Sequence, residues 1–427
     1  MKGMLAEILE PILGTGLIPA DISVWKARRP VIQPGFHLRW LERMAGTFNE
    51  CAELMITELD KKAAAGEAVN MESVFNSVSL DIIGKAVFNY DFGSVTSESP
   101  VIKAAYACLK EAEHRATFLV PYWNIPVIGQ GPFAVVPRQR EFYGHLQVLN
   151  NKLNEMIRDA RASENKGDLE ALESRNYQVL QDPSLLRFLV DLRGGDCDDK
   201  QLRDDLMTLL VAGHETTGSL LTWTAFELAQ HPEELRKAQD EVDRVLAGRA
   251  PTLEDIKRLD CIRLILTEGL RLYPQPPILL RRCLSEVKLP AAHAGDVERG
   301  DERGMQFKGV TLSRDANVFV SVWNLHRNPT LWENPNDFKP DRFRHKIAGV
   351  SHPEWDGYTP KEPLGMYPNE VDANFGFIPF GGGQRKCVGD QVLRLLSLLP
   401  VPFCAMVSKS NHMFCLRLRA RSAVSLQ

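Results

Sequence analysis

The sequence predicts a mainly α-helical fold with a small β portion. Apolar residues keep a helical period across residues 198–230, and residues 36–160 show the same spacing in shorter runs. Short apolar segments at 278–288 and 316–322 predict strands. With 44% hydrophobic and 25% charged residues, the 427-residue chain has the composition of a globular protein. We expect one domain over residues 1–427, with a core large enough to bury a bulky cofactor.

The expected elements alternate with breaks that are rich in proline, glycine or charge. Residues 1–20 predict a short helix that Pro11 ends, and residues 121–137 are a proline-rich break in the helical region. Residues 161–183 are charged and polar, as in a solvated loop. The helix predicted over 198–230 ends at His231-Pro232, and residues 233–273 continue as helix. Residues 344–373 predict a coil that leads toward the segment 379–390.

The charge balance argues against a nucleic-acid partner. The chain has 51 Lys and Arg against 55 Asp and Glu, a net charge of −4, and therefore no basic surface for phosphates. The eight cysteines form no Cys-x-x-Cys pair, so we expect neither a zinc site nor a disulfide framework, and a reducing compartment. No apolar run is long enough to span a bilayer, and the first residues lack a signal-peptide pattern. We expect a soluble or peripheral membrane protein.

The most chemically specific segment is the loop 379–390, in which three glycines precede a basic pair and Cys387. Glycines allow positive φ and a close approach of the backbone to a flat group. Arg385, Lys386 and the start of a helix favour a thiolate over a thiol. A thiolate on such a loop suits a haem iron. The alternatives are a buried structural cysteine and a phosphate-binding loop, although the latter needs a terminal Gly-Lys-Ser/Thr that is absent here.

Five positions of this loop fit the pattern Phe-x-x-Gly-x-Arg-x-Cys-x-Gly, namely Phe380, Gly383, Arg385, Cys387 and Gly389. The loop resembles the haem-binding loop of the cytochromes P-450. The resemblance implies a cytochrome P-450 fold, haem b as the cofactor, and the Cys387 thiolate as the axial ligand that favours O–O cleavage. It also implies a haem-thiolate monooxygenase that hydroxylates an apolar substrate with O2 and two electrons from a reductase or ferredoxin.

The middle of the long helix carries an unusual segment, residues 212–217 (Ala-Gly-His-Glu-Thr-Thr). Glycine costs about 1 kcal/mol of helix stability relative to alanine, and threonine side chains that bond to preceding carbonyls bend helices. A packing notch is one explanation of such a distortion. The segment also resembles the Ala/Gly-Gly-x-Asp/Glu-Thr pattern of the family's central helix. That resemblance implies that Gly213 leaves room for dioxygen, that Thr216 hydrogen-bonds it, and that Glu215 supplies protons through water.

Donor side chains elsewhere resemble the family's contacts to the haem propionates. Trp25 and Arg29 are four residues apart and carry only hydrogen-bond donors, which suits a carboxylate. The alternative for this pair is a surface helix with one half-buried tryptophan. The resemblance assigns Trp25 and Arg29 to a propionate. It adds Arg281, which follows the proline run on a predicted strand, and Arg385 of the loop.

Three charged residues are expected to be structural. Glu268 and Arg271 lie three residues apart, which alone describes a common surface pair. Because the proline-rich segment 273–277 follows them, they resemble the family's Glu-x-x-Arg pattern. The resemblance implies a buried triad with Arg342 that supports the haem loop. A buried carboxylate between two guanidiniums is tolerated only when it is fully paired.

Segments along nearly the whole chain resemble the plastid carotenoid-hydroxylase branch of the cytochromes P-450 (family 97), with the B-type that acts on β-rings nearest. They include residues 89–93, 111–115, 136–140, 186–190, 273–277 and 367–371. The resemblance implies hydroxylation of a carotenoid β-ring in carotenoid biosynthesis, and a chloroplast location.

Two departures from the family pattern suggest an alternative. The chain begins just before the Trp25 helix, so we expect the family's N-terminal sheet and any targeting peptide to be missing. Residues 391–413 predict a shortened, proline-broken region before a terminal strand at 414–419. The alternative function is a haem-binding remnant with impaired catalysis. A helical interaction module without haem is a third reading, but it leaves the cysteine loop and the distorted helix unexplained.

Overall fold

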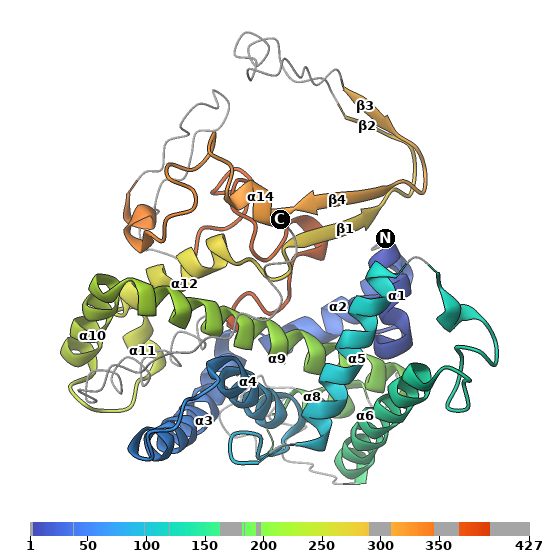
Figure 1. Cartoon of the computed structure of the whole chain (residues 1–427), viewed down its shortest axis with the longest axis horizontal. Helices are drawn as coiled ribbons and strands as arrows, with labels where there is room; N and C mark the ends of the chain where they lie inside the picture. Colours follow the sequence, from blue (N-terminus) through green and yellow to red (C-terminus); the bar gives the residue numbers. More distant parts are fainter. Residues whose placement is uncertain are drawn as a thin grey trace. The chain divides into compact units, whose positions relative to one another are not determined.

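The computed structural model describes residues 3–36, 38–97, 99–118, 120–162, 182, 184–193, 198–289, 309–345 and 367–392. By its internal contacts the chain divides into two compact units, and each is described by itself. The first unit holds Leu5–Ser219, and the second begins at Leu220 and includes Gly3 and Met4. The long helix α9 (Asp199–Gln230) contributes to both (Figure 1). The expectation of a single domain stays a prediction.

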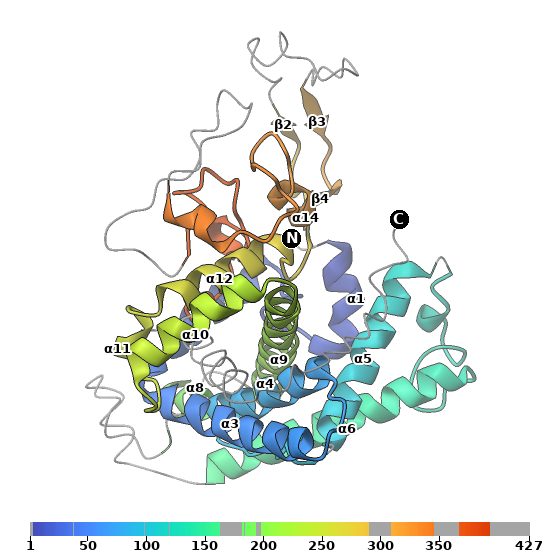
Figure 2. The same ribbon diagram turned by 60° about the vertical axis from the view of Figure 1, so that its left-hand side comes forward.

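The first unit is helical. Its helices before α9 are α1 (Met4–Leu13), α2 (Ile22–Ile32), η1 (Gln33–Phe36), α3 (Leu38–Ala64), α4 (Met71–Phe88), α5 (Pro100–Thr117), η2 (Tyr122–Asn124), α6 (Pro137–Ala162) and α8 (Leu185–Arg193). Helix α3 packs on α4 and α5 packs on α6, while α8 contacts both α4 and α6. Figure 2 views α9 nearly end-on, with α4 and α5 of the same unit beside it.

Side-chain caps explain where several of these helices begin. The Asn70 side chain accepts a hydrogen bond from the Ser73 amide at the start of α4, at 3.2 Å. Ser99 caps α5 in the same way, and Pro100 follows at the first helical position, where a missing N–H costs nothing. The predicted stop of the long helix is confirmed, because α9 ends at Gln230 and α10 begins at Pro232.

The predicted end of the first helix at Pro11 is wrong. Helix α1 continues through Pro11 to Leu13, and the Gly14 amide donates to the Glu10 carbonyl at 2.8 Å. A proline so close to the end of a helix removes one hydrogen bond but keeps a helical φ. Leu13 is fully buried, and its packing offsets that loss.

The second unit contains the remaining helices and two small sheets. Its elements after α9 are α10 (Pro232–Leu246), α11 (Leu253–Ile256), α12 (Asp260–Leu272), β1 (Ile278–Arg282), β2 (Val287–Leu289), β3 (Val310–Leu312), β4 (Asn317–Ser321), α14 (Val322–His326), η4 (Pro340–Arg344) and η5 (Gly383–Arg385). Every residue from Cys261 to Leu272 is buried, so α12 is the centre of this unit's core. The predicted mainly helical fold with a small β portion is confirmed.

The strand predicted over 278–288 is two strands that pair with different partners. Strand β1 pairs antiparallel with β4, with Leu280 opposite Phe319, and β2 pairs antiparallel with β3 (Figure 1). Between them, Cys283 exchanges backbone hydrogen bonds with Ala316 and Asp315, both at 2.9 Å. Asp315 has φ +66°, so the ladder turns at this point.

Several predicted features lie outside the described residues. They are the polar loop over 163–181, most of the coil between 346 and 366, the region from 393 onward that was expected to be shortened, and the terminal strand at 414–419.

Candidate functional site

The cysteine loop of the second unit is closed by backbone hydrogen bonds. The Cys387 amide donates to the Phe380 carbonyl at 2.9 Å, and the Lys386 amide donates to the Gly383 carbonyl at 3.0 Å. Gly381 and Gly383 have φ values of +70° and +68°. Residues with side chains rarely adopt such values, so these two glycines allow the loop to reverse direction within a few residues.

Cys387 differs from the other cysteines of the described segments by its environment. Its side chain is exposed, and the Gly389 amide donates to its sulfur at 3.3 Å. By contrast, burial raises the thiol pKa of Cys51, Cys108 and Cys261 to about 12, so these three remain neutral thiols. A sulfur that is presented on a loop and receives an N–H bond has the chemistry of a thiolate ligand. The residues present therefore fit a haem-thiolate group.

The sequence predicts that Lys386 favours the Cys387 thiolate, but the structure shows this lysine paired with carboxylates. Lys386 Nζ lies 2.9 Å from a Glu370 carboxylate oxygen and 3.3 Å from one of Asp390. The Tyr367 hydroxyl donates to Asp390 at 2.7 Å, and its ring centroid lies 4.9 Å from that of Phe380. Because two carboxylates offset the charge of Lys386, this lysine holds the loop in shape more than it favours the thiolate.

The structure brings Glu268, Arg271 and Arg342 together. Arg271 donates from Nε and Nη2 to the two oxygens of Glu268, both at 2.8 Å, and Arg342 Nε donates to Glu268 Oε1 at 3.0 Å. Glu268 and Arg271 are fully buried. The Lys339 amide donates to the same carboxylate at 2.9 Å. The carboxylate is therefore fully paired, which a buried charge requires.

His326 connects this triad to the cysteine loop, and the sequence analysis did not find it. The Ile378 amide donates to His326 Nε2 at 2.8 Å, and Nδ1 lies 3.2 Å from the Arg271 carbonyl oxygen. The ring therefore carries its proton on Nδ1. It stacks on Phe377, with ring centroids 5.0 Å apart. Burial and the Arg271 charge lower the pKa of His326 to about 3, so it stays neutral. No local pattern marks this residue, because its partners are distant in the sequence.

The remaining predicted donors of the second unit lie on β1 and η5. Arg281 is partly buried on β1 opposite Val318, and its Nη1 donates to the Leu280 carbonyl at 2.8 Å. Burial lowers the pKa of its guanidinium below the usual value. Arg385 is partly buried in η5, two residues before Cys387. Both are partly buried cations, a setting that suits a carboxylate partner.

In the first unit, Trp25 and Arg29 lie on α2, partly buried. Arg29 Nε is 3.5 Å from Gln33 Oε1. The neighbouring residue Arg28 donates to Asp205 Oδ2 of α9 at 2.6 Å. The Asp205 side chain is fully buried in this ion pair, so Arg28 fixes α2 against α9. Arg28 thereby orients the helix face that carries Trp25 and Arg29.

The segment of α9 for which the composition predicts a distortion is helical throughout. It forms the bond from a threonine side chain to a preceding carbonyl that the composition also predicts. Thr216 Oγ1 donates to the Ala212 carbonyl at 2.6 Å, one turn earlier. Because its hydrogen is used in that bond, Thr216 presents oxygen lone pairs to its surroundings. A Cβ on Gly213 would lie 2.5 Å from Ile83 Cδ1 of α4, so a larger residue here would require the end of the Ile83 side chain to move. Glu215 is partly buried, and burial raises its carboxyl pKa.

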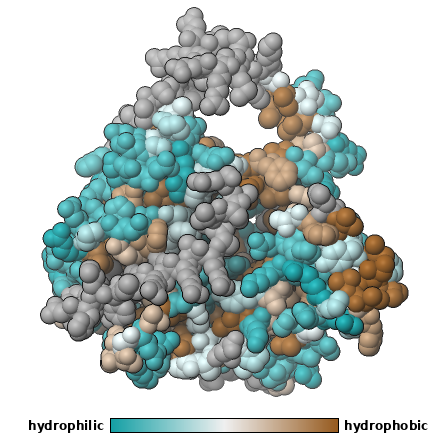
Figure 3. Space-filling model, viewed as in Figure 1, coloured by the Kyte–Doolittle hydropathy of each residue, from teal (hydrophilic) through white to brown (hydrophobic). Residues whose placement is uncertain are grey.

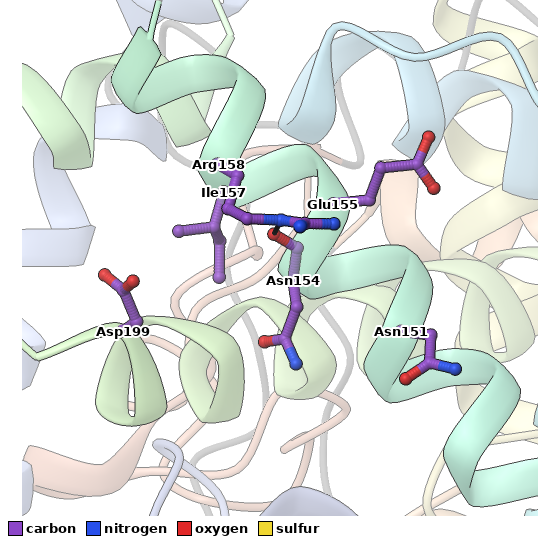
Figure 4. A pocket seen from close by; sticks show the side chains of 6 residues that line it. All are labelled: Asn151, Asn154, Glu155, Ile157, Arg158 and Asp199. Atoms are coloured by element: carbon purple, nitrogen blue, oxygen red, sulfur yellow. Dashed lines mark hydrogen bonds between the residues drawn. The ribbon is translucent and has the colours of Figure 1, made fainter.

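A surface groove of about 720 Å³ lies elsewhere in the first unit (Figure 4). It is lined by Asn151, Asn154, Glu155, Ile157 and Arg158 of α6 and by Asp199 of α9. Asp199 is 17 residues before Thr216 on the same helix, a distance of about 25 Å at 1.5 Å per residue. None of the predicted site residues lines this groove.

Comparison with known proteins agrees with these features. Residues 2–395 match the family described as Cytochrome P-450. The chain is 50% identical to cytochrome P-450 97B1, chloroplastic, of Pisum sativum over 418 residues, which are 96% of this chain and 73% of that protein. It is 51% identical to cytochrome P-450 97B2, chloroplastic, of Glycine max, covering 91% of this chain and 67% of that one.

A more distant relative carries a more specific name. Carotene epsilon-monooxygenase, chloroplastic, of Arabidopsis thaliana is 40% identical over 392 residues, which are 91% of this chain and 65% of that protein. The family match covers both units, from α1 through the Cys387 loop. The chain therefore belongs to the cytochrome P-450 family.

Proposed function

We propose that this protein is a haem-thiolate monooxygenase that hydroxylates an apolar substrate, with Cys387 as the axial ligand. The observation that carries the proposal is the exposed Cys387 sulfur on a glycine-rich, hydrogen-bonded loop, within a chain of the cytochrome P-450 family. Haem b, when bound through the thiolate, supplies the activation of O2 with two electrons from a ferredoxin or reductase.

The protein's own residues would hold the thiolate loop in place, bind the haem propionates and carry protons. The Gly389 amide bonds the sulfur, while the Glu268 triad and His326 fix the approach to the loop. Trp25, Arg29, Arg281 and Arg385 provide donors for the two propionate carboxylates. In α9, Thr216 presents an acceptor oxygen, and burial raises the pKa of the Glu215 carboxyl group, which suits Glu215 for carrying protons.

We further propose that the substrate is a carotenoid, hydroxylated on its β-ring, and that the protein acts in plastids. The support for the substrate class is the 40% identity to a protein named for the oxidation of carotene. The support for the location is the chloroplastic naming of the relatives at 50% and 51% identity. Feeding β-carotene to the reconstituted enzyme and identifying the product by mass spectrometry tests the ring position. A product without a ring hydroxyl would contradict this assignment.

The oxygenase proposal is tested by reducing the haem-loaded protein and adding CO. A thiolate ligand displaces the Soret band of the CO complex to long wavelength, and that displacement is the expected result. A band at the position typical of a neutral ligand would favour the alternative, a haem-binding remnant without catalysis. The absence of haem absorbance would contradict both.

Replacing Thr216 by valine is expected to divert electrons from product to hydrogen peroxide. Valine keeps the shape but has no oxygen to accept a hydrogen bond, so proton delivery loses an ordered partner. Product per electron is expected to fall about tenfold or more, measured as the ratio of product to peroxide. Thr216→Ser, which keeps the hydroxyl, serves as the control. Equal coupling in both variants would remove Thr216 from proton delivery.

We also propose that the protein contacts a membrane surface peripherally, through the apolar loop, residues 120–136. Figure 3 shows apolar surface gathered at this position. The loop exposes Val120, Ile125, Val127, Ile128, Phe133 and Val135 by 42–90%. No charged residue occurs between 116 and 137, and Arg138 and Arg140 follow directly. An exposed apolar patch with aromatic residues and flanking cations is typical of an interfacial contact. No helix of the described segments is long and apolar enough to cross a membrane.

Replacing Phe133, which is 90% exposed, by aspartate is expected to weaken binding to liposomes by about tenfold or more. The reason is that one large apolar side chain is lost and a charge is added at the bilayer surface. Flotation with liposomes measures the bound fraction. The matched control is Phe319→Asp on β4, where Phe319 is 56% exposed and lies outside the loop. If both variants float like the unaltered protein, the loop is not the contact.

A further inference from the structure

Three helices of the first unit meet around His214 and Glu215. The Tyr106 ring of α5 lies edge-on to the His214 ring, with centroids 5.5 Å apart. On the α4 side, Gly218 lets Asn76 approach the helix, because a Cβ at Gly218 would overlap Asn76 Oδ1. Polar side chains from α4, α5 and α9 therefore meet next to Glu215 in the sequence of α9. Figure 2 shows these three helices side by side.

Two of these side chains carry buried polar atoms that have no hydrogen-bond partner among the described residues. His214 is fully buried, and among the described residues neither of its ring nitrogens has a hydrogen-bond partner. The same holds for Asn76 Oδ1, whose residue is 4% exposed. Buried polar atoms in native proteins bond to protein or to ordered water, and each such water makes about three hydrogen bonds. His214 and Asn76 thus offer bonding positions for water between the helices.

Two solvent-facing carboxylates act on Glu215 from the flanking helices. Glu72 lies exposed in the first turn of α4, and Glu113 lies exposed on α5. Burial raises the pKa of Glu215, and the negative charges of Glu113 and Glu72 raise it further. Glu72 lies one turn before Asn76 on α4, and Glu113 lies two turns after Tyr106 on α5. Residues at these spacings share a helix face, so each outer carboxylate lies on the face that carries a member of the cluster.

Oxygen insertion needs such a connection. One O2, two electrons from the donor protein, two protons and one C–H bond give one C–OH group and one water. The protons originate in solvent, whereas Glu215 is partly buried. Each turnover therefore draws protons inward to this carboxyl group, which must be reprotonated before the next.

We propose that Glu72 and Glu113 take up protons from solvent and pass them to Glu215 through water held by His214 and Asn76. The proposal rests on the proposed monooxygenase function. At each transfer an O–H bond breaks on the outer carboxyl group and one forms on water, and the chain ends with an O–H bond on Glu215.

The titratable neighbours of Glu215 suit this role. Burial lowers the pKa of His214 to about 4, so its ring is neutral near pH 7 and offers one donor and one acceptor nitrogen. Burial, together with the charges of Glu215 and Glu72, raises the pKa of the Tyr106 hydroxyl, so it also stays neutral. Near pH 7, therefore, neither the His214 ring nor the Tyr106 hydroxyl adds a net charge beside Glu215.

The first test follows the titration of Glu215 by 13C NMR of protein labelled at glutamate Cδ, with the signal assigned through Glu215→Gln. In Glu113→Gln and Glu72→Gln, the midpoint for Glu215 is expected to fall by about half a pH unit, because a nearby negative charge is removed. Both outer residues are exposed, so these isosteric changes preserve the fold. The matched control is Glu53→Gln, exposed on α3, which is expected to leave the midpoint unchanged.

The second test measures coupling in the haem-loaded enzyme. In the double variant Glu72→Gln/Glu113→Gln, product per electron is expected to fall about tenfold. A larger solvent deuterium isotope effect on product formation is expected as well, since proton delivery becomes slower. A purely structural role would change neither the isotope effect nor the Glu215 titration.

The two tests separate this proposal from the function on which it rests. An unchanged Glu215 midpoint in both single variants, or full coupling in the double variant, overturns the relay. The other outcome is that the Glu215 midpoint shifts as expected but the CO complex lacks the thiolate band. That result supports the cluster of carboxylates around Glu215 and overturns the oxygenase function.

Discussion

Replacing Cys387 by serine is expected to abolish the thiolate-type band of the reduced CO complex and all substrate hydroxylation. Serine has the same shape, but its hydroxyl remains protonated near neutral pH, so it cannot donate charge to iron as a thiolate does. The backbone bonds that close the loop, from Cys387 to Phe380 and from Lys386 to Gly383, do not involve the side chain. The loop is therefore expected to keep its shape while haem affinity falls.

The matched control for this experiment is Cys283→Ser. Cys283 is the other cysteine of the described segments that is not buried, and it lies after β1, where its backbone bonds Ala316 and Asp315. This variant is expected to retain the spectrum and the activity. Retention of the thiolate band in the Cys387 variant would overturn the assignment of the axial ligand, and with it the oxygenase function.

Replacing Glu268 by alanine is expected to destabilise the protein by about 3–5 kcal/mol. The change leaves Arg271 fully buried and Arg342 nearly so, each with its positive charge unpaired. It also removes the acceptor of the Lys339 amide. The apparent free energy of unfolding in urea measures the loss. Because the triad lies next to His326 and the Ile378 amide, haem retention is expected to fall in parallel.

The chain offers a close control at the same sequence spacing. Glu254 and Lys257 also lie three residues apart and form an ion pair at 3.1 Å, but their side chains are 83% and 74% exposed. Glu254→Ala is expected to change the apparent stability by less than about 1 kcal/mol, since water screens an exposed pair. Equal effects at the two sites would show that the Glu268 triad is not a buried support.

The sequence predicted the parts of the molecule that depend on local chemistry. The long helix was predicted over 198–230 and is found at Asp199–Gln230, because its period and the proline at 232 act within a few residues. The same is true of the cysteine loop, where two of the three consecutive glycines adopt positive φ. Glu268 and Arg271 were selected by a three-residue spacing together with the resemblance of their surroundings.

Other parts required contacts between residues that are distant in the sequence. His326 bonds an amide 52 residues away, and Arg28 bonds a carboxylate 177 residues away. The role of Gly218 depends on Asn76 of another helix, and His214 contacts Tyr106 of a third. The strand predicted over 278–288 divides into β1, which pairs with β4, and β2, which pairs with β3. The apolar pattern of one segment does not reveal that its two halves have different partners.

By itself, the sequence determined the helical class, the loop that presents Cys387, and the family, because these follow from short-range spacing and residue type. Only the tertiary structure decided which side chains surround them: the paired charge of Lys386, the histidine behind the loop, and the carboxylates that flank Glu215. The physical reason is that burial, charge pairing and hydrogen bonding depend on distance in space. Residue order alone does not specify that distance.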